Sequence, residues 1–440
     1  MRFVMPLSIR RPLLRCMLAL IAALGLPAVL AAQAAPDTAV RVFVMTMGPG
    51  DLVWERFGHN ALWVHDPRTG TDAAYNYGMF DFGQENFFRN FIQGRMLYWM
   101  SGLDAGRTLE HYASMNRSVA VQELNLTPAQ ARALADFLAA NELPQNRFYR
   151  YDYYRDNCST RVRDAIDRVL GGRLRAATQN VPSGTTYRSH TERLTAAGAA
   201  DVPIFTALMG GLGPAADRPI SRWEEMFLPG ALHDRLAEMR VPDASGRMVP
   251  LVLREREAVP STRPAPPAEA PGWIPGYLAA GLALAGVLAL LAARAGRSGA
   301  ARFGFAAVAG LWLVLAGVGG WVLLGLWSLT DHSIAYRNEN ILQLSPLALP
   351  LVLLLPALAY GARWAARPAW LLAAAMAALS VLGFILQPLP GLDQANGWII
   401  ALAMPVNLAL AWAARRMSAG LPARPAVRSE RGPRRAPAPA

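Results

Sequence analysis

The chain has 440 residues, of which 53% are hydrophobic and 17% are charged, a composition that indicates membrane helices. Its formal net charge of +12 would suggest a nucleic-acid partner, but residues 36–270 carry 26 arginines against 27 acidic residues, a net charge of −1. The excess arginines lie in the flanking segments, which a positive-inside topology keeps in the cytoplasm. The positive net charge therefore reflects the orientation of the chain in the membrane and gives no support for nucleic-acid binding.

The first 35 residues have the pattern of a secretory signal peptide. Arg10, Arg11 and Arg15 precede an apolar run that ends in the small residues "AAQAA", so we predict cleavage near Ala34 or Ala35. The alternative is a first transmembrane helix that is retained. Cleavage would remove Cys16 and leave Cys158 as the remaining cysteine of the chain.

Residues 36–258 are predicted to form a periplasmic domain of mixed strands and helices. Alternation and turn residues predict strands at residues 40–47, 58–66, 73–82, 95–103, 118–126 and 146–154. "PRTGT" joins the second and third of these as a hairpin. Helices are predicted at residues 52–57, 84–93 and 128–143, and another begins at Cys158. The mixed order favours an α+β fold.

Cys158 lies in "YDYYRDNCSTRVRDAIDRVLGG", where Asp156 or Asn157 can cap a helix. The helical repeat places Cys158, Val162 and Ile166 on one apolar stripe, while the arginines of the helix point away. At a helix N-terminus the dipole and the free N–H groups favour a thiolate. Spacing alone leaves two interpretations open, a small apolar core residue and a nucleophile.

A cysteine nucleophile needs a base, and His59 is the first candidate because it begins a strand after Gly58 in "RFGHNALWV". If the hairpin turns near Arg68, His59 and Asn76 are diagonal neighbours on one face, roughly 7–8 Å apart. Asn76 could then orient the imidazole as the third member of a triad. His65, on the same face, is the rival third member, and a purely structural histidine is the alternative for His59.

The C-terminal part is predicted to be a five-helix transmembrane domain. After a Pro-rich linker at residues 259–271, five apolar runs are long enough to cross a bilayer, which takes about 20 residues. They are residues 273–293, 305–329, 342–360, 368–386 and 398–414. Within this domain of residues 272–414, five crossings that start in the periplasm put the arginine-rich tail, residues 415–440, in the cytoplasm.

One periplasmic loop of this domain, "TDHSIAYRNEN", is dense in polar groups. Arg337 could hold a lipid phosphate, and His332 could serve the site from the membrane side. Together with Asn338 and Asn340 they are candidate substrate-binding residues. The alternative is an ordinary solvated loop.

Two motifs carry a resemblance to a known family. "GPGDLVWERFGHNALWV", followed about a hundred residues later by "YDYYRDNCSTRVRDAID", resembles the Lnb N-terminal periplasmic domain, and residues 272–414 are similar to the Lnb membrane half. The family resembles circularly permuted, NlpC-like papain folds, in which a strand histidine precedes a helix cysteine. Retinol acyltransferases share that order and an Asn-Cys pair, matched here by Asn157 and Cys158. In those relatives a second histidine follows the first at a shorter spacing than Asn76 follows His59 here, so Asn76 and His65 both stay candidates for the third member of the triad.

The resemblance implies a cysteine acyltransferase of the bacterial inner membrane. It would move an acyl chain from a phospholipid, through a thioester on Cys158, to an amine such as the N-terminus of a lipoprotein, with Asn157 among the substrate-binding candidates. No metal or other cofactor is expected, since the sequence lacks a spacing such as H-E-x-x-H. Two alternatives stay open, a Cys-His peptidoglycan amidase or endopeptidase and a non-catalytic binding or assembly module of the envelope.

Overall fold

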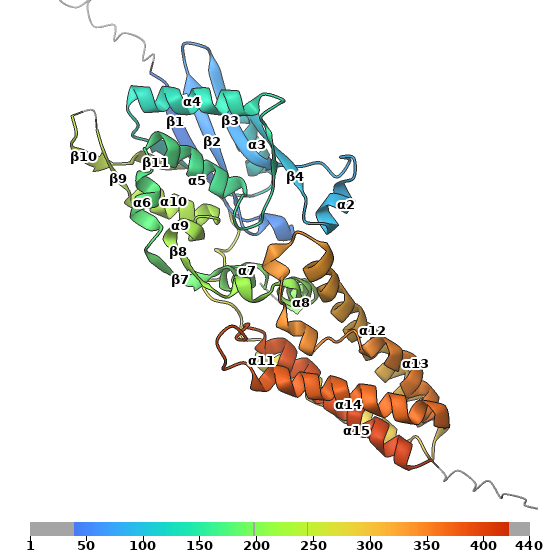
Figure 1. The fold of residues 1–440 in the computed structure, drawn as a ribbon. Coiled ribbons are helices and arrows are strands. Elements are labelled where there is room, and N and C mark those ends of the chain that lie inside the picture. The colour runs from blue at the N-terminus through green and yellow to red at the C-terminus, as the bar shows by residue number, and fades with distance from the viewer. Residues whose placement is uncertain (1–38, 197–198, 244, 422–440) are drawn as a thin grey trace, which may run out of the picture.

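The computed structural model describes residues 39–196, 199–243 and 245–421. The predicted signal peptide and most of the basic tail lie outside these residues. Figure 1 shows a sheet-containing domain at one end of the molecule and a bundle of long helices at the other. The prediction of an α+β domain followed by a helical region is thus confirmed, while its permuted papain-like character stays a prediction.

The N-terminal domain is built on a seven-stranded sheet with the order β11-β5-β1-β2-β3-β4-β6, in which all neighbouring strands are antiparallel. Most of the strands are runs in which β-branched and aromatic residues are frequent, as sheets favour. The strands are β1 Arg41–Met47, β2 His59–Asp66, β3 Thr71–Met79, β4 Leu97–Asp104, β5 Val119–Leu124, β6 Phe148–Arg150 and β11 Val252–Val259.

Both faces of the sheet are covered, because successive side chains of a strand point to opposite sides. In β1, Val42 and Val44 belong to the larger core, which lies under α4 (Pro128–Glu142), α5 (Cys158–Val169) and α10 (Pro229–Glu238). Met45 and its odd-numbered neighbours belong to a second, smaller core against α3 (Ala105–Ser114). The sheet is therefore the central layer of the domain.

Shorter elements surround this frame. Pairs of short strands form two small sheets, and short helices connect the larger elements. These elements are η1 Val53–Glu55, α2 Phe87–Ile92, α6 Arg173–Thr178, β7 Pro182–Thr186, α7 Tyr187–Thr195, η2 Ala199–Asp201, α8 Val202–Gly211, η3 Pro214–Ala216, β8 Pro219–Ser221, α9 Arg222–Glu225, β9 Arg240–Pro242 and β10 Met248–Pro250.

The C-terminal region is helical. Among the described residues, four helices are long and apolar enough to cross a membrane: α11 Ile274–Arg294, α12 Gly299–Leu329, α14 Arg363–Ile385 and α15 Gly397–Ala419. The predicted third span, residues 342–360, is largely a 12-residue helix, α13 Ala348–Ala359, which follows the 3₁₀ helices η4 Ser333–Ala335 and η5 Glu339–Leu342. The count of five crossings therefore stays a prediction.

Hydrogen bonds explain why the chain before α13 need not be helical. Gln343 is buried and donates to the Ser380 carbonyl at 3.0 Å, and the Asn407 amide donates to the Gln343 carbonyl at 3.1 Å. Irregular backbone at membrane depth is tolerated where the protein itself supplies such partners. Apolar composition alone predicted a longer helix because it does not register these polar contacts.

Candidate active site

The β2–β3 hairpin brings His59 and Asn76 together. Ala61 pairs with Asn76 and Asp66 with Thr71, which confirms the predicted turn and register. His59 is therefore diagonal to Asn76, and its Nε2 lies 3.1 Å from Asn76 Oδ1. Gly58 precedes the histidine with a φ of 82°, and a Cβ there would lie 2.7 Å from the Met47 carbonyl oxygen. Only glycine fits this turn without strain.

The Asn76 amide fixes the tautomer of the histidine. Asn76 Nδ2 donates to the Ala74 carbonyl at 2.9 Å, so Oδ1 is the atom that faces the imidazole. An amide oxygen only accepts, so Nε2 of His59 carries the proton and Nδ1 keeps its lone pair. A half-buried imidazole with an unprotonated Nδ1 can act as a general base.

Cys158 begins α5, and Asn157 caps the helix as one of the two predicted caps. Asn157 Oδ1 accepts from Ser159 N at 3.0 Å and from Thr160 N at 2.9 Å, while Nδ2 donates to the carbonyls of Tyr153 and Phe227. All hydrogen-bonding groups of this side chain are engaged within the protein. Asn157 therefore positions the first turn of α5 and the cysteine on it.

The thiol lies beside the strand that carries His59. The backbone N–H groups of Asn60, Ser159 and Cys158 point at the sulfur, and Asn60 is the residue directly after His59. On the neighbouring strand, a Cβ built on Gly78 would lie 3.5 Å from Cys158 Cβ. Both side chains are described, and no hydrogen bond joins the thiol to the imidazole. Unliganded catalytic sites often have such open geometry.

Burial keeps both groups neutral. Burial raises the pKa of the Cys158 thiol, although the backbone N–H groups and the Arg117 guanidinium oppose it. Burial also lowers the pKa of His59 to about 4, against the hydrogen bond that His59 donates to Asn76, and Arg117 lowers it further. The predicted thiolate is thus wrong for this state, because desolvation outweighs the helix terminus. The pair is a thiol and a neutral base.

Two side chains near the thiol were missed by the sequence analysis. Arg117 is buried, donates to the Gly48 carbonyl at 3.0 Å and lies 4.9 Å from the Tyr112 ring. Tyr149 is 8% exposed, and its hydroxyl has no hydrogen-bond partner among the described residues. This hydroxyl lies 3.9 Å from a Cβ built on Gly78, next to the cysteine. The aromatic run "FYRYDYY" was the available signal.

The rival His65 lies at the other end of the hairpin. It pairs with Asp72, and its Nδ1 is 3.4 Å from the Asp72 carboxylate in an exposed setting. Because a strand advances about 3.3 Å per residue, six residues separate His65 from His59 by roughly 20 Å. Asn76, and not His65, is therefore the residue that contacts the imidazole of His59.

The candidates in the membrane loop form a second group. His332 donates from Nε2 to the Phe91 carbonyl at 2.9 Å and stacks on Tyr153. Asn338 and Asn340 are buried, and both donate to the Gly210 carbonyl, at 2.8 and 3.0 Å. Arg337 is exposed with a φ of 55°. The contacts of His332, Asn338 and Asn340 therefore join the membrane region to the periplasmic domain.

A cavity of about 330 Å³ opens beside the Gly58 turn. Its lining includes Gly58, His190, Arg193 and Glu225, but neither Cys158 nor His59. His190 donates to Glu225 at 3.2 Å and accepts from Arg193 at 3.1 Å, so its polar groups are engaged. Chemistry, and not cavity size, therefore identifies the candidate site at Cys158.

Two family models match the chain. Residues 27–193 match the Lnb N-terminal periplasmic domain, and residues 277–414 match the Lnb transmembrane domain. The first match contains the whole Cys158 site, and the second contains most of α11 to α15. Searches of curated proteins and of solved structures found no match.

Proposed function

Because the chain belongs to the Lnb-type family, we propose that it is a cysteine acyltransferase that moves an acyl chain from a phospholipid, through a thioester on Cys158, to an amine. Family membership supports a membrane-associated role in lipoprotein processing. The lipoprotein N-terminus is therefore the acceptor that we favour. The proposal includes the domain boundaries expected from the sequence and a cytoplasmic C-terminus.

One observation carries the proposal: the sulfur of Cys158 meets the backbone N–H of Asn60, beside a histidine whose tautomer Asn76 fixes. In the first step the thiol proton passes to His59 Nδ1 as the sulfur attacks the ester carbonyl carbon. The carbon–oxygen bond then breaks, and the imidazolium returns its proton to the departing glycerol oxygen. The products are a thioester and a lysophospholipid.

The second step reverses these roles. An amine nitrogen attacks the thioester carbonyl and loses a proton to His59, and the carbon–sulfur bond breaks. The sulfur recovers the proton, and the acyl chain leaves as an amide. Because the His59 imidazole holds a proton weakly, with a pKa of about 4, it returns the proton readily to each leaving group, although it takes the thiol proton less readily than an imidazole of ordinary pKa would.

Negative charge on the carbonyl oxygen needs donors in both steps. The N–H of Cys158 at the start of α5 is one candidate. The Tyr149 hydroxyl is the other, since it is buried beside Gly78 and has no partner among the described residues. A donor that waits unpaired in a desolvated site needs no reorganisation when charge develops.

The test is transfer in proteoliposomes that contain a phospholipid with a labelled acyl chain and a diacylated lipoprotein peptide. The intact chain should convert the peptide to its N-acylated form, and Cys158→Ala should not. If the intact protein instead cleaves muropeptides and leaves the peptide unmodified, the amidase alternative replaces the proposal. If Cys158→Ala supports normal lipoprotein N-termini in cells, a non-catalytic role replaces it.

A further inference from the structure

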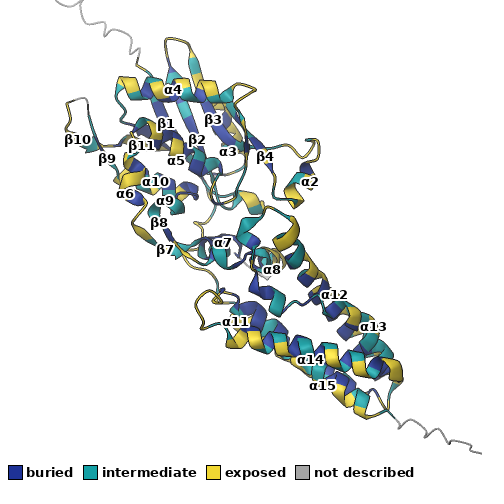
Figure 2. Ribbon diagram, in the orientation of Figure 1, coloured by how far each residue is buried: buried dark blue, intermediate teal, exposed yellow. Residues whose placement is uncertain are grey.

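An exposed apolar surface surrounds α2, and we call it the α2 patch. It consists of Trp54, Phe82, Phe88, Phe91 and Ile92, whose exposed fractions run from 43% to 66%. In Figure 2 the α2 region projects from the domain with much of its surface exposed. Large exposed apolar patches mark interaction sites, and the chain around the patch identifies the partner.

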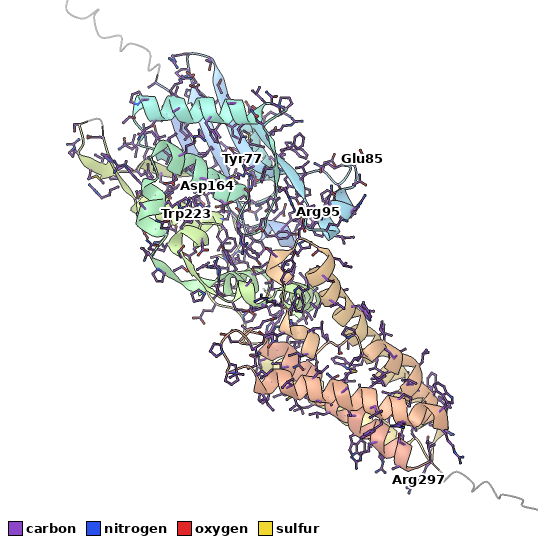
Figure 3. The ribbon with its side chains drawn as sticks, in the orientation of Figure 1. Tyr77, Glu85, Arg95, Asp164, Trp223 and Arg297 are labelled. Atoms are coloured by element: carbon purple, nitrogen blue, oxygen red, sulfur yellow. The ribbon has the colours of Figure 1, made fainter. Side chains whose placement is uncertain are left out.

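The patch is tied to the end of a membrane-spanning helix. Asp331, two residues after α12, donates its N–H to the Gln93 carbonyl at 2.8 Å, and its carboxylate accepts from Arg95 and Arg150 at 3.0 Å. His332 binds the Phe91 carbonyl. Figure 3 places Arg95 at the base of α2, and Arg297 at the opposite end of the helix bundle. The patch therefore lies at the periplasmic boundary.

The apolar surface continues from α12 onto the patch. Trp327 and Leu329, in the last turn of α12, are 46% and 78% exposed. The 31 residues of α12 extend about 46 Å, whereas the hydrocarbon core is about 30 Å thick. The last turns of α12 thus reach the interfacial region, where aromatic side chains are favoured.

A series of aromatic rings also connects the α2 patch to Cys158. Phe82 lies 5.2 Å from Phe80, Phe80 lies 5.1 Å from Tyr98, and Tyr98 lies 4.4 Å from Tyr151, measured between ring centroids. Tyr151 and Cys158 both lie within 4 Å of a Cβ built on Gly78. Continuous apolar side chains therefore lead from the exposed patch to the thiol.

We propose that the α2 patch inserts into the outer leaflet of the phospholipid bilayer beside α12, and that it thereby brings an acyl ester of a membrane lipid to Cys158. The insertion does not depend on any enzymatic activity. The delivery of the ester rests on the proposed function. The exposed Arg89 on α2 adds a cation at the level of the lipid phosphates.

Lipid quenching tests the insertion. Phe88→Cys is introduced into the full chain with Cys16→Ser and Cys158→Ser, labelled with bimane and reconstituted in phosphatidylcholine and phosphatidylglycerol vesicles with brominated acyl chains. Leu315→Cys on α12 is the lipid-exposed control, and Leu253→Cys on β11 is the remote control, with exposed fractions of 61% and 55%. We expect quenching at position 88 to reach at least half of that at position 315, with none at 253.

Quenching at position 88 no greater than at position 253, with position 315 quenched, overturns the insertion. This result is independent of catalysis because the reporter chain lacks the thiol. For delivery, the Phe88→Ser, Ile92→Ser double variant should raise the lipid concentration at half-maximal rate about tenfold, with kcat within twofold, whereas Leu253→Ser should change neither. An unchanged lipid dependence overturns delivery alone, whereas an inactive wild-type protein overturns the proposed function.

Discussion

Two regions of this molecule are rich in polar side chains, and they differ in what those side chains contact. In the loop after α12, His332, Asn338 and Asn340 direct their donors to backbone carbonyls of the periplasmic domain. At the Cys158 site, the buried hydroxyl of Tyr149 has no partner among the described residues, and Nδ1 of the half-buried His59 forms no hydrogen bond there. In the loop, the side-chain oxygen of Asn340 is also unpaired. Buried polar groups are normally satisfied, so the unpaired Tyr149 hydroxyl, which lies next to the cysteine, is a candidate to contact a substrate.

The largest expected effect separates His59 from His65. His59→Ala should lower kcat/KM for acyl transfer roughly 10²–10⁴-fold, as loss of a general base does. His65→Ala removes an exposed side chain at the far end of the hairpin and should change kcat/KM less than twofold. Labelled-lipid assays of the two variants in proteoliposomes check this. An equal loss of kcat/KM in both variants would contradict the assignment of His59 as the general base.

Tyr149→Phe isolates the unpaired hydroxyl. The ring contacts are kept, so the fold should be unaffected, while loss of one oxyanion donor should lower kcat roughly 10²–10³-fold. Tyr77→Phe is the matched control, because its hydroxyl already donates to Asn141 at 2.7 Å. A Tyr149→Phe enzyme with normal kcat would remove the hydroxyl from the mechanism.

The pH profile tests the depressed pKa of His59. The base must be neutral, so kcat/KM should hold as pH falls through 6.5 and decline only near the folded pKa of about 4. The stability of the fold should also depend on pH. Unfolded His59 takes up a proton near pH 6.5 and folded His59 only near pH 4, so the free energy of unfolding falls as the pH is lowered from 6.5 to 4. Initial rates and melting temperatures across pH 3.5–8 check both. A decline of kcat/KM that is centred at pH 6.5 would mean that His59 is solvated in the folded protein.

Asn76→Ala should have a smaller effect on rate. It removes the acceptor that holds the Nε2–H tautomer, and loss of one such hydrogen bond is worth about 1 kcal/mol, or roughly fivefold in kcat. Asn76→Asp restores an acceptor and should recover part of the rate. If Asn76→Ala is as inactive as the His59 variant, the asparagine contributes more than orientation.

The smallest effect on chemistry is expected in the membrane loop. Asn338→Ala leaves the Gly210 carbonyl with one donor fewer, so it should lower the melting temperature in detergent, for a cost of about 1–3 kcal/mol, while kcat/KM stays within twofold. Arg337→Ala changes an exposed side chain and should alter stability by less than about 0.5 kcal/mol. A tenfold rise in the lipid KM of either variant would instead show that the loop is part of the substrate-binding site.

Local patterns predicted the parts of the site that are encoded locally. The turn and the strand alternation were enough to place His59 diagonal to Asn76, and the helix pattern was enough to place Cys158 after its Asn157 cap. Contacts between distant segments were not predictable. Arg163 was expected to point to solvent, but it is buried and donates to the Trp223 carbonyl at 2.8 Å.

The same limit applies to the environment of the thiol. The raised pKa of the thiol comes from its burial, to which the neighbouring strands β2, β3 and β6 contribute, whereas the helix N-terminus alone suggested a lowered pKa. Tyr149 gains its place through the pairing of β6 with β4. Neither effect has a signature within a short window of sequence.

The most direct test of the central claim is mass spectrometry of the Cys158 peptide after the purified full-length protein has been incubated with phospholipid vesicles without an acceptor. We predict a mass increase of one acyl chain on Cys158 that hydroxylamine removes and that a lipoprotein peptide with a free N-terminus discharges. An active protein whose Cys158 stays unmodified, or whose acyl chain is found on another residue, would contradict it.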